Sequence, residues 1–151
     1  RYLAREYGLG TLYPSDSRQA ALSDQWMTWS TDSFMGTFFP VFWQLVRTEE
    51  AQRDYDKIAE MAKKSSDILR TLEGHLINNN FVAGKELTYG DIPLGVLIHK
   101  YFVLDIERPS LPGIEAWYGR LCEREAFQEH AMQPFGNSPE EFLELQRLGE
   151  Q

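Results

Sequence analysis

Hydrophobic side chains recur every three or four positions along most of the chain, which is the spacing of one face of an α-helix. The longest stripe follows a capping pair, Asp16 with Gln19, and consists of Leu22, Trp26, Trp29 and Ser33, continued one face over by Phe38, Phe42 and Leu45. Pro40 lies inside this stripe. Because its ring removes one helical hydrogen bond, the pattern predicts a bend near Phe39–Pro40 within a helix that continues.

Further helices are predicted wherever the same spacing returns. They are a second long helix from a cap at Thr48 to Asn78, one from Thr88 to about Leu104, one starting at Pro112 and one after Ser138. No segment shows the sustained alternation or the hairpin signals of β-strands. The sequence therefore predicts an all-α fold of five main helices, with a helical stub at residues 1–8.

The start of the helix after Thr88 carries a complete set of capping signals. Thr88 and Asp91 stand at the positions of a capping box, in which each side chain accepts the other's backbone N–H. Leu87 and Ile92 occupy the two positions of a hydrophobic staple. Gly90, together with Gly95 one turn on, leaves bare surface where another helix can approach closely.

Composition and charge exclude some classes of partner. The chain has 151 residues, 42% of them hydrophobic, which fits one domain with a filled core. A net charge of -8 disfavours nucleic acid and anionic membrane surfaces as partners. Cys122 is the single cysteine, and no stretch resembles a signal peptide or a membrane span. A cytoplasmic location is therefore expected.

The titratable residues form no recognisable catalytic or metal-binding motif. His75, His99 and His130 are scattered, without a second ligand three or four residues away, so no metal is expected. Cys122 has no basic cluster beside it and is interpreted as a small hydrophobic residue. Since phosphate loops and nucleophile elbows are also lacking, no catalytic residue is assigned in this sequence.

The aromatic residues between Trp26 and Trp43 exceed what one core-facing stripe requires. The surplus rings can fill the core or a subunit interface, or they can line a concave apolar pocket, which Met35 favours through its flexible side chain. Arg47, at the end of this helix, is either a solvated residue at the helix C-terminus or a carboxylate-binding residue.

Several segments together resemble the C-terminal, all-helical domain of soluble glutathione transferases, particularly bacterial ones. FVAGKELTYGDI (81–92) is similar to the capping box and staple of that family, and LPGIEAWYGRLCEREAFQEH (111–130) is similar to the helix that follows. RYLAREYG (1–8) resembles the end of the preceding thioredoxin-like domain, residues 9–15 a linker, and residues 16–151 the helical domain. Pro93 departs from the pattern because it forfeits a hydrogen bond in the second helical turn.

The resemblance implies a set of roles for residues of this chain. The electrophile pocket would consist of Met35, Phe38, Phe39 and Phe42 on the first long helix, opposed by Tyr101. Thr28, Asp32 and Arg47 would lie near glutathione and the interface of a homodimer, while Thr88 and Asp91 would be structural caps.

The implied activity is the conjugation of glutathione, as co-substrate, to small hydrophobic electrophiles in detoxification. The thiol-activating residue would belong to the missing thioredoxin-like domain, this chain's expected partner, so the chain alone would be inactive. The alternative is a non-catalytic interaction module, because the same helical fold also serves as an adaptor.

Overall fold

The computed structural model describes residues 1–149, and all of its regular elements are helical. The α-helices are α1 (Tyr2–Tyr7), α2 (Ser17–Trp29), α3 (Met35–Val46), α4 (Tyr55–Leu76), α5 (Asp91–Val103), α6 (Pro112–Cys122), α7 (Glu125–His130) and α8 (Pro139–Gly149). Within residues 1–149 there is no β-strand, so the predicted all-α class is confirmed. None of these helices combines the length and apolar character needed to cross a bilayer.

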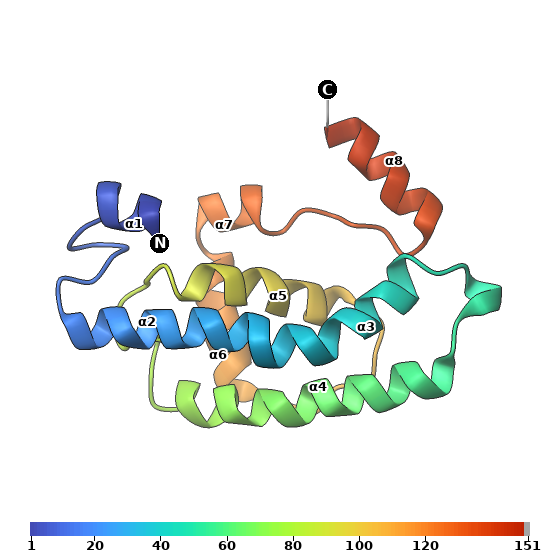
Figure 1. Cartoon of the computed structure of the whole chain (residues 1–151), viewed down its shortest axis with the longest axis horizontal. Helices are drawn as coiled ribbons and strands as arrows, with labels where there is room; N and C mark the ends of the chain where they lie inside the picture. Colours follow the sequence, from blue (N-terminus) through green and yellow to red (C-terminus); the bar gives the residue numbers. More distant parts are fainter. Residues whose placement is uncertain (150–151) are drawn as a thin grey trace.

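The helices pack in two layers around one core (Figure 1). α3 lies against α4, α2 lies against α5, and α6 contacts both α4 and α5. Figure 1 shows α6 running across the direction of α4 and α5, while α8 extends away from the bundle.

The first long helix contains a turn of π-helix, Ser30–Phe34, between α2 and α3. The buried residues Trp26, Ser30, Phe34 and Phe38 are spaced four apart along it. In a regular α-helix each four-residue step drifts by about 40°, since one residue turns about 100°. The wider π-helical turn takes up an additional residue. It therefore keeps this buried stripe facing the bundle, passing through Phe34 instead of the predicted Ser33.

Pro40 does not interrupt the helical path. α3 continues through Pro40 to Val46, as predicted. In Figure 1 α3 is inclined to the line of α2. This change of direction agrees with the bend expected where proline removes a hydrogen bond and crowds the preceding turn.

Three of the predicted helix starts are confirmed by their hydrogen bonds or position. The Asp16 carboxylate accepts the Gln19 N–H at 2.8 Å, at the start of α2. Pro112 is the first residue of α6. The Ser138 hydroxyl accepts the Glu141 N–H at 3.2 Å, at the start of α8.

The predicted start of the second long helix at Thr48 is wrong. The Thr48 hydroxyl donates to the carbonyl of Trp43 at 3.3 Å, at the end of α3. A short 3-10 turn, Glu50–Gln52, follows, and α4 begins only after Asp54, whose carboxylate accepts the Lys57 N–H at 3.0 Å. Aspartate caps a helix as well as threonine or better, and the sequence pattern did not separate the two sites.

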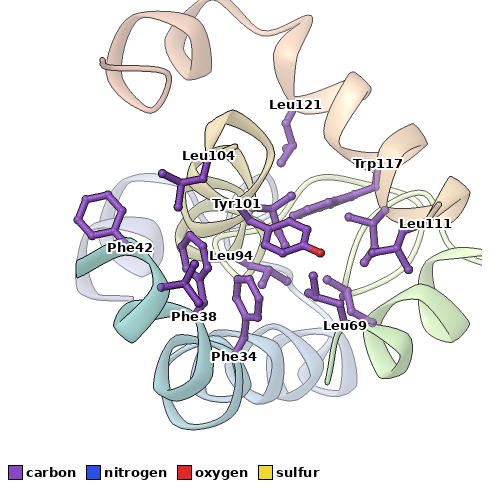
Figure 2. Packing of buried hydrophobic residues seen from close by; sticks show 14 of the residues in the cluster. Phe34, Phe38, Phe42, Leu69, Leu94, Tyr101, Leu104, Leu111, Trp117 and Leu121 are labelled. Carbon is purple, nitrogen blue, oxygen red and sulfur yellow. The ribbon is translucent and has the colours of Figure 1, made fainter. Parts of the chain in front are cut away.

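The core is a continuous aromatic and aliphatic cluster between the two layers (Figure 2). Its largest fully buried side chains include Trp117 of α6, Tyr101 of α5 and Phe34 and Phe38 of the first long helix. Phe34 and Phe38 stack in parallel with ring centroids 5.3 Å apart, and Tyr101 packs edge-on against both. The ring geometry is that preferred by aromatic pairs.

Close helix contacts at Gly90 and Gly95 are confirmed. A Cβ atom on Gly90 would lie 2.7 Å from the carbonyl oxygen of Ser23 in α2. A Cβ atom on Gly95 would lie 2.6 Å from Leu121 Cδ1 and 2.9 Å from a ring carbon of Phe127. The first of these neighbours is backbone, so Gly90 sets how closely the start of α5 approaches α2.

Candidate functional site

A buried carboxylate organises the start of α5. Asp91 is fully buried, and its Oδ1 accepts the Val82 N–H and the Trp117 indole N–H, both at 2.9 Å. Its Oδ2 accepts the Thr88 N–H at 2.8 Å and the Thr88 hydroxyl at 3.0 Å. Burial raises the pKa of the Asp91 carboxyl, and these hydrogen bonds act in the opposite direction. One side chain therefore joins the 81–84 turn, α5 and α6.

Thr88 is bonded differently from the expected capping box. The Asp91 N–H donates to the Thr88 carbonyl at 3.1 Å instead of to its hydroxyl. That hydroxyl accepts a hydrogen bond from Ser23 of α2 at 3.0 Å. Thr88 thus connects α2 to α5, while Ile92 of the expected staple remains 42% exposed. Ser23, Thr88 and Asp91 are all buried, so the geometry of this junction suits a structural role.

The surplus aromatic residues lie on an exposed side of α3. Met35, Phe39 and Trp43 recur every four residues and are 36%, 42% and 49% exposed. Phe39 contacts Trp43, with ring centroids 5.8 Å apart. Phe39 and Trp43 also line a groove of about 230 Å³ between α3 and α4, together with Ile58 and Met61. α3 therefore presents a partly exposed apolar surface.

The five residues expected to form one pocket wall are divided between this surface and the core. Met35 and Phe39 are exposed, whereas Phe38 and Tyr101 are fully enclosed, the Tyr101 hydroxyl lying 3.0 Å from the Ser66 hydroxyl. Phe42 lies between the two groups, 9% exposed. The sequence pattern missed this division because the π-helical turn changes which residues of α3 face inward.

Two of the polar residues expected near glutathione lie earlier on the same long helix. The Thr28 hydroxyl accepts a hydrogen bond from the Arg1 guanidinium at 3.1 Å, and Arg1 also pairs with Asp24 at 2.5 Å. Asp32 is exposed and accepts only a local bond, from the Thr31 hydroxyl at 3.1 Å. These hydrogen bonds hold Thr28 to Arg1 and Asp32 to its own turn.

Two cations lie over aromatic rings at the far end of α3. The Arg47 guanidinium carbon is 3.3 Å from the ring centroid of Phe142 in α8. The Lys100 ammonium of α5 is 4.6 Å from the ring centroid of Phe135 and 5.5 Å from that of Phe42. Sequence reasoning missed Lys100, although a lone lysine within the apolar run 92–104 is a signal for a partly buried charge.

The remaining titratable side chains offer no metal site. Nδ1 of His99 lies 2.8 Å from the Tyr118 hydroxyl, and burial, with a smaller contribution from Lys100, lowers the pKa of His99. Cys122 is half-buried. Among residues 1–149, no group of three His, Cys, Asp or Glu side chains is arranged to hold a metal ion.

Comparison with known proteins identifies relatives over nearly the whole chain. Residues 34–125 match the family model of the glutathione S-transferase C-terminal domain. Glutathione S-transferase GstB of Escherichia coli K12 is 28% identical over 134 residues, which are 89% of this chain and 64% of that protein. This chain therefore spans less than two thirds of its curated bacterial relative.

Solved structures show the same arrangement of helices. The theta class glutathione S-transferase of Xanthomonas axonopodis pv. citri, solved with glutathione bound, is 41% identical with a TM-score of 0.85. The alignment covers 90% of this chain and 71% of that one. The Bombyx mori glutathione transferase BmGSTD1 is 26% identical with a TM-score of 0.71, over 87% and 60% of the two chains. The chain belongs to the glutathione S-transferase C-terminal domain family.

Proposed function

We propose that this chain is the C-terminal domain of an enzyme that conjugates glutathione to small hydrophobic electrophiles. The observation that carries the proposal is 41% identity, over 90% of this chain, to a glutathione transferase solved with glutathione bound. Glutathione would be the co-substrate, without a metal, and the enzyme would be a cytoplasmic homodimer active in detoxification.

Within this proposal the exposed side of α3 supplies the apolar wall for the electrophile. Met35 and Phe39 would contact it directly because they are partly exposed, and Phe42 would border it. Phe38 and Tyr101, which pack against each other in the core, would hold α3 against α5. The sequence led us to expect that Phe38 and Tyr101 contact the electrophile. In this proposal they support the pocket wall from the core instead.

The thiol of glutathione would be activated by a thioredoxin-like domain that covers α1. The exposure of Tyr2, Leu3 and Tyr7, each at least 67% accessible, supports a partner surface there. Asp32 and Thr28 would then lie on the side of the long helix that approaches glutathione. Residues 1–8 would belong structurally to that domain, and residues 9–15 would connect it to the helical bundle.

The experiment joins this chain to the thioredoxin-like domain of the Xanthomonas enzyme and measures conjugation of glutathione to 1-chloro-2,4-dinitrobenzene. We expect activity in the fusion and none in the 151-residue chain alone. Replacing Met35 and Phe39 together by alanine should lower kcat/KM about tenfold, since each loses part of its apolar contact area. Ile77→Ala, an exposed apolar residue at the end of α4, is the matched control.

Two outcomes would contradict the proposal. A folded fusion without conjugating activity would favour the interaction-module alternative. Equal activity in the double variant and in Ile77→Ala would remove Met35 and Phe39 from the electrophile site.

A further inference from the structure

A groove of about 760 Å³ lies between α4 and residues 105–109 of the connection from α5 to α6. Figure 1 shows this connection passing close to α4 on its way to α6. The volume is within the range of sites for small organic ligands, about 300–1,000 Å³. Of the residues that line the groove beside Phe39 and Trp43, only Ile58 also lines this one. The two grooves are therefore separate features of the surface.

The floor of this groove is mainly apolar. Ile58 and Ala62, one turn apart on α4, are 7% and 5% exposed, and Ile106 of the connection is half-buried. Ser66 is also buried here, and its hydroxyl already donates to the Ala62 carbonyl at 2.9 Å. The ring of Tyr55, at the start of α4, lines the groove as an exposed side chain. An aliphatic or aromatic body would thus lose contact with water on this floor, which favours its binding.

Charged side chains surround the apolar floor, and most of them already have partners. Glu60 pairs with Lys64 of the next helical turn, and Asp67 lies 3.5 Å from Arg70. Arg108 donates to two carbonyl oxygens at the end of α5. These groups satisfy one another or the backbone, so they do not determine the charge of a ligand.

Two carboxylates on the connection have no such partner. Asp105 and Glu107 line the groove, and neither takes part in an ion pair or a side-chain hydrogen bond within residues 1–149. They follow the end of α5 at Val103, where the helix dipole favours positive charge instead of negative. Across the groove, α4 contributes one unpaired cation from the described lining, Lys63. The unpaired charges therefore leave an excess of negative charge, which a bound cation would offset.

We propose that this groove binds an organic cation, a primary ammonium group carried on an apolar body. The ammonium has three donors and would form charge-assisted hydrogen bonds with the carboxylates of Asp105 and Glu107. The apolar body would lie along Ile58, Ala62 and Ile106. This inference goes beyond the proposed enzymatic activity and does not depend on it.

The experiment titrates the 151-residue chain with fluorescent probes that share a dansyl ring and a pentyl linker and differ at the end of the linker. Dansylcadaverine ends in an ammonium, N-pentyldansylamide in a methyl group and dansyl-6-aminohexanoate in a carboxylate. Asp105→Asn combined with Glu107→Gln should weaken binding of dansylcadaverine about fivefold, the effect expected for exposed charge pairs. The same variant should change binding of the neutral probe less than about twofold, and it should not weaken binding of the anion.

A matched control is needed because the chain has a net charge of -8 and attracts any cation. Glu49→Gln combined with Glu123→Gln removes two exposed acids outside the groove, and it should weaken binding of dansylcadaverine less than about twofold. Far-ultraviolet circular dichroism and thermal unfolding show that each variant folds.

Two further variants test the groove independently of its acids. Lys63→Met removes the opposing cation and should strengthen binding of dansylcadaverine about twofold. Ala59→Leu places a larger side chain at an exposed position of the groove lining, so it should weaken binding of the same probe.

Three outcomes would overturn the proposal. The first is that the wild-type chain binds dansylcadaverine no more tightly than N-pentyldansylamide. The second is equal weakening of dansylcadaverine in the groove variant and the matched control, which would show general attraction to an acidic protein. The third is weaker binding of the cation, together with unchanged binding of the anion, in Lys63→Met.

Discussion

Asp91→Ala should be among the most destabilising single substitutions in this domain. The change leaves three fixed donors without an acceptor: the N–H groups of Val82 and Thr88 and the indole N–H of Trp117. Each buried donor left unpaired costs about 1–3 kcal/mol. Three such losses add up to about 3–9 kcal/mol. Because water can enter part of the space left by the side chain, we expect a total in the lower half of this range, about 3–6 kcal/mol.

That loss approaches the whole stability of an ordinary domain, which is about 5–15 kcal/mol. It also exceeds the cost of about 1 kcal/mol expected for an exposed helix cap. The difference arises because the bonds of Asp91 are buried and reach the 81–84 turn and α6 as well as α5. The sequence showed only the bond to Thr88.

Urea unfolding followed by tryptophan fluorescence and circular dichroism measures the effect. Asp91→Asn keeps the shape but turns one acceptor into a donor, so it should cost less than alanine. Thr88→Val removes the hydroxyl that joins Ser23 and Asp91, and should cost about 1–2 kcal/mol. Asp32→Ala, at an exposed site, is the control. A cost below about 1 kcal/mol for Asp91→Ala would refute the summed hydrogen-bond reasoning.

Four further substitutions test other parts of the fold by the same unfolding measurement. Gly90→Ala forces a Cβ against the Ser23 carbonyl and should cost about 1–3 kcal/mol; an unchanged midpoint would contradict the close contact. Burial chiefly raises the pKa of Tyr89 from 10.0 to about 12, so its contribution is complete below pH 10 and is lost as the pH rises to 12. Wild type should therefore lose up to about 1.4 kcal/mol per pH unit more than Tyr89→Phe in that window; parallel pH curves would exclude this linkage. Phe38→Ala should cost about 3–5 kcal/mol and Phe39→Ala much less, and the reverse order would show that their burial is misassigned.

Local signals in the sequence were sufficient for much of the fold. The Asp16–Gln19 cap, Pro112 at the first position of α6 and the close contact at Gly90 all depend on neighbouring residues or on the absence of a side chain. The predicted helix start at Thr48 is wrong because two residues that can cap a helix, Thr48 and Asp54, lie within seven positions. Packing decides which of them begins α4.

The candidate site was less accessible to sequence reasoning. Helical periodicity places Phe38 and Phe39 next to each other but does not state which of them faces inward when the helix changes its pitch. Lys100 and Phe135 are 35 positions apart, and only the tertiary fold brings them together. The bond between Trp117 and Asp91, 26 positions apart, is long-range in the same sense.

The π-helical turn at Ser30–Phe34 makes the backbone conformation of one turn as important as the composition of the first long helix. If the turn became regular α-helix at unchanged length, α3 would rotate by about 100° relative to α2 and Phe38 would leave the core. Deleting one residue within the turn would instead restore a regular α-helix and leave α3 close to its present orientation, because the wider turn already takes up that residue. The conformation of this one turn thus decides which aromatic rings are interior and which are available to a ligand.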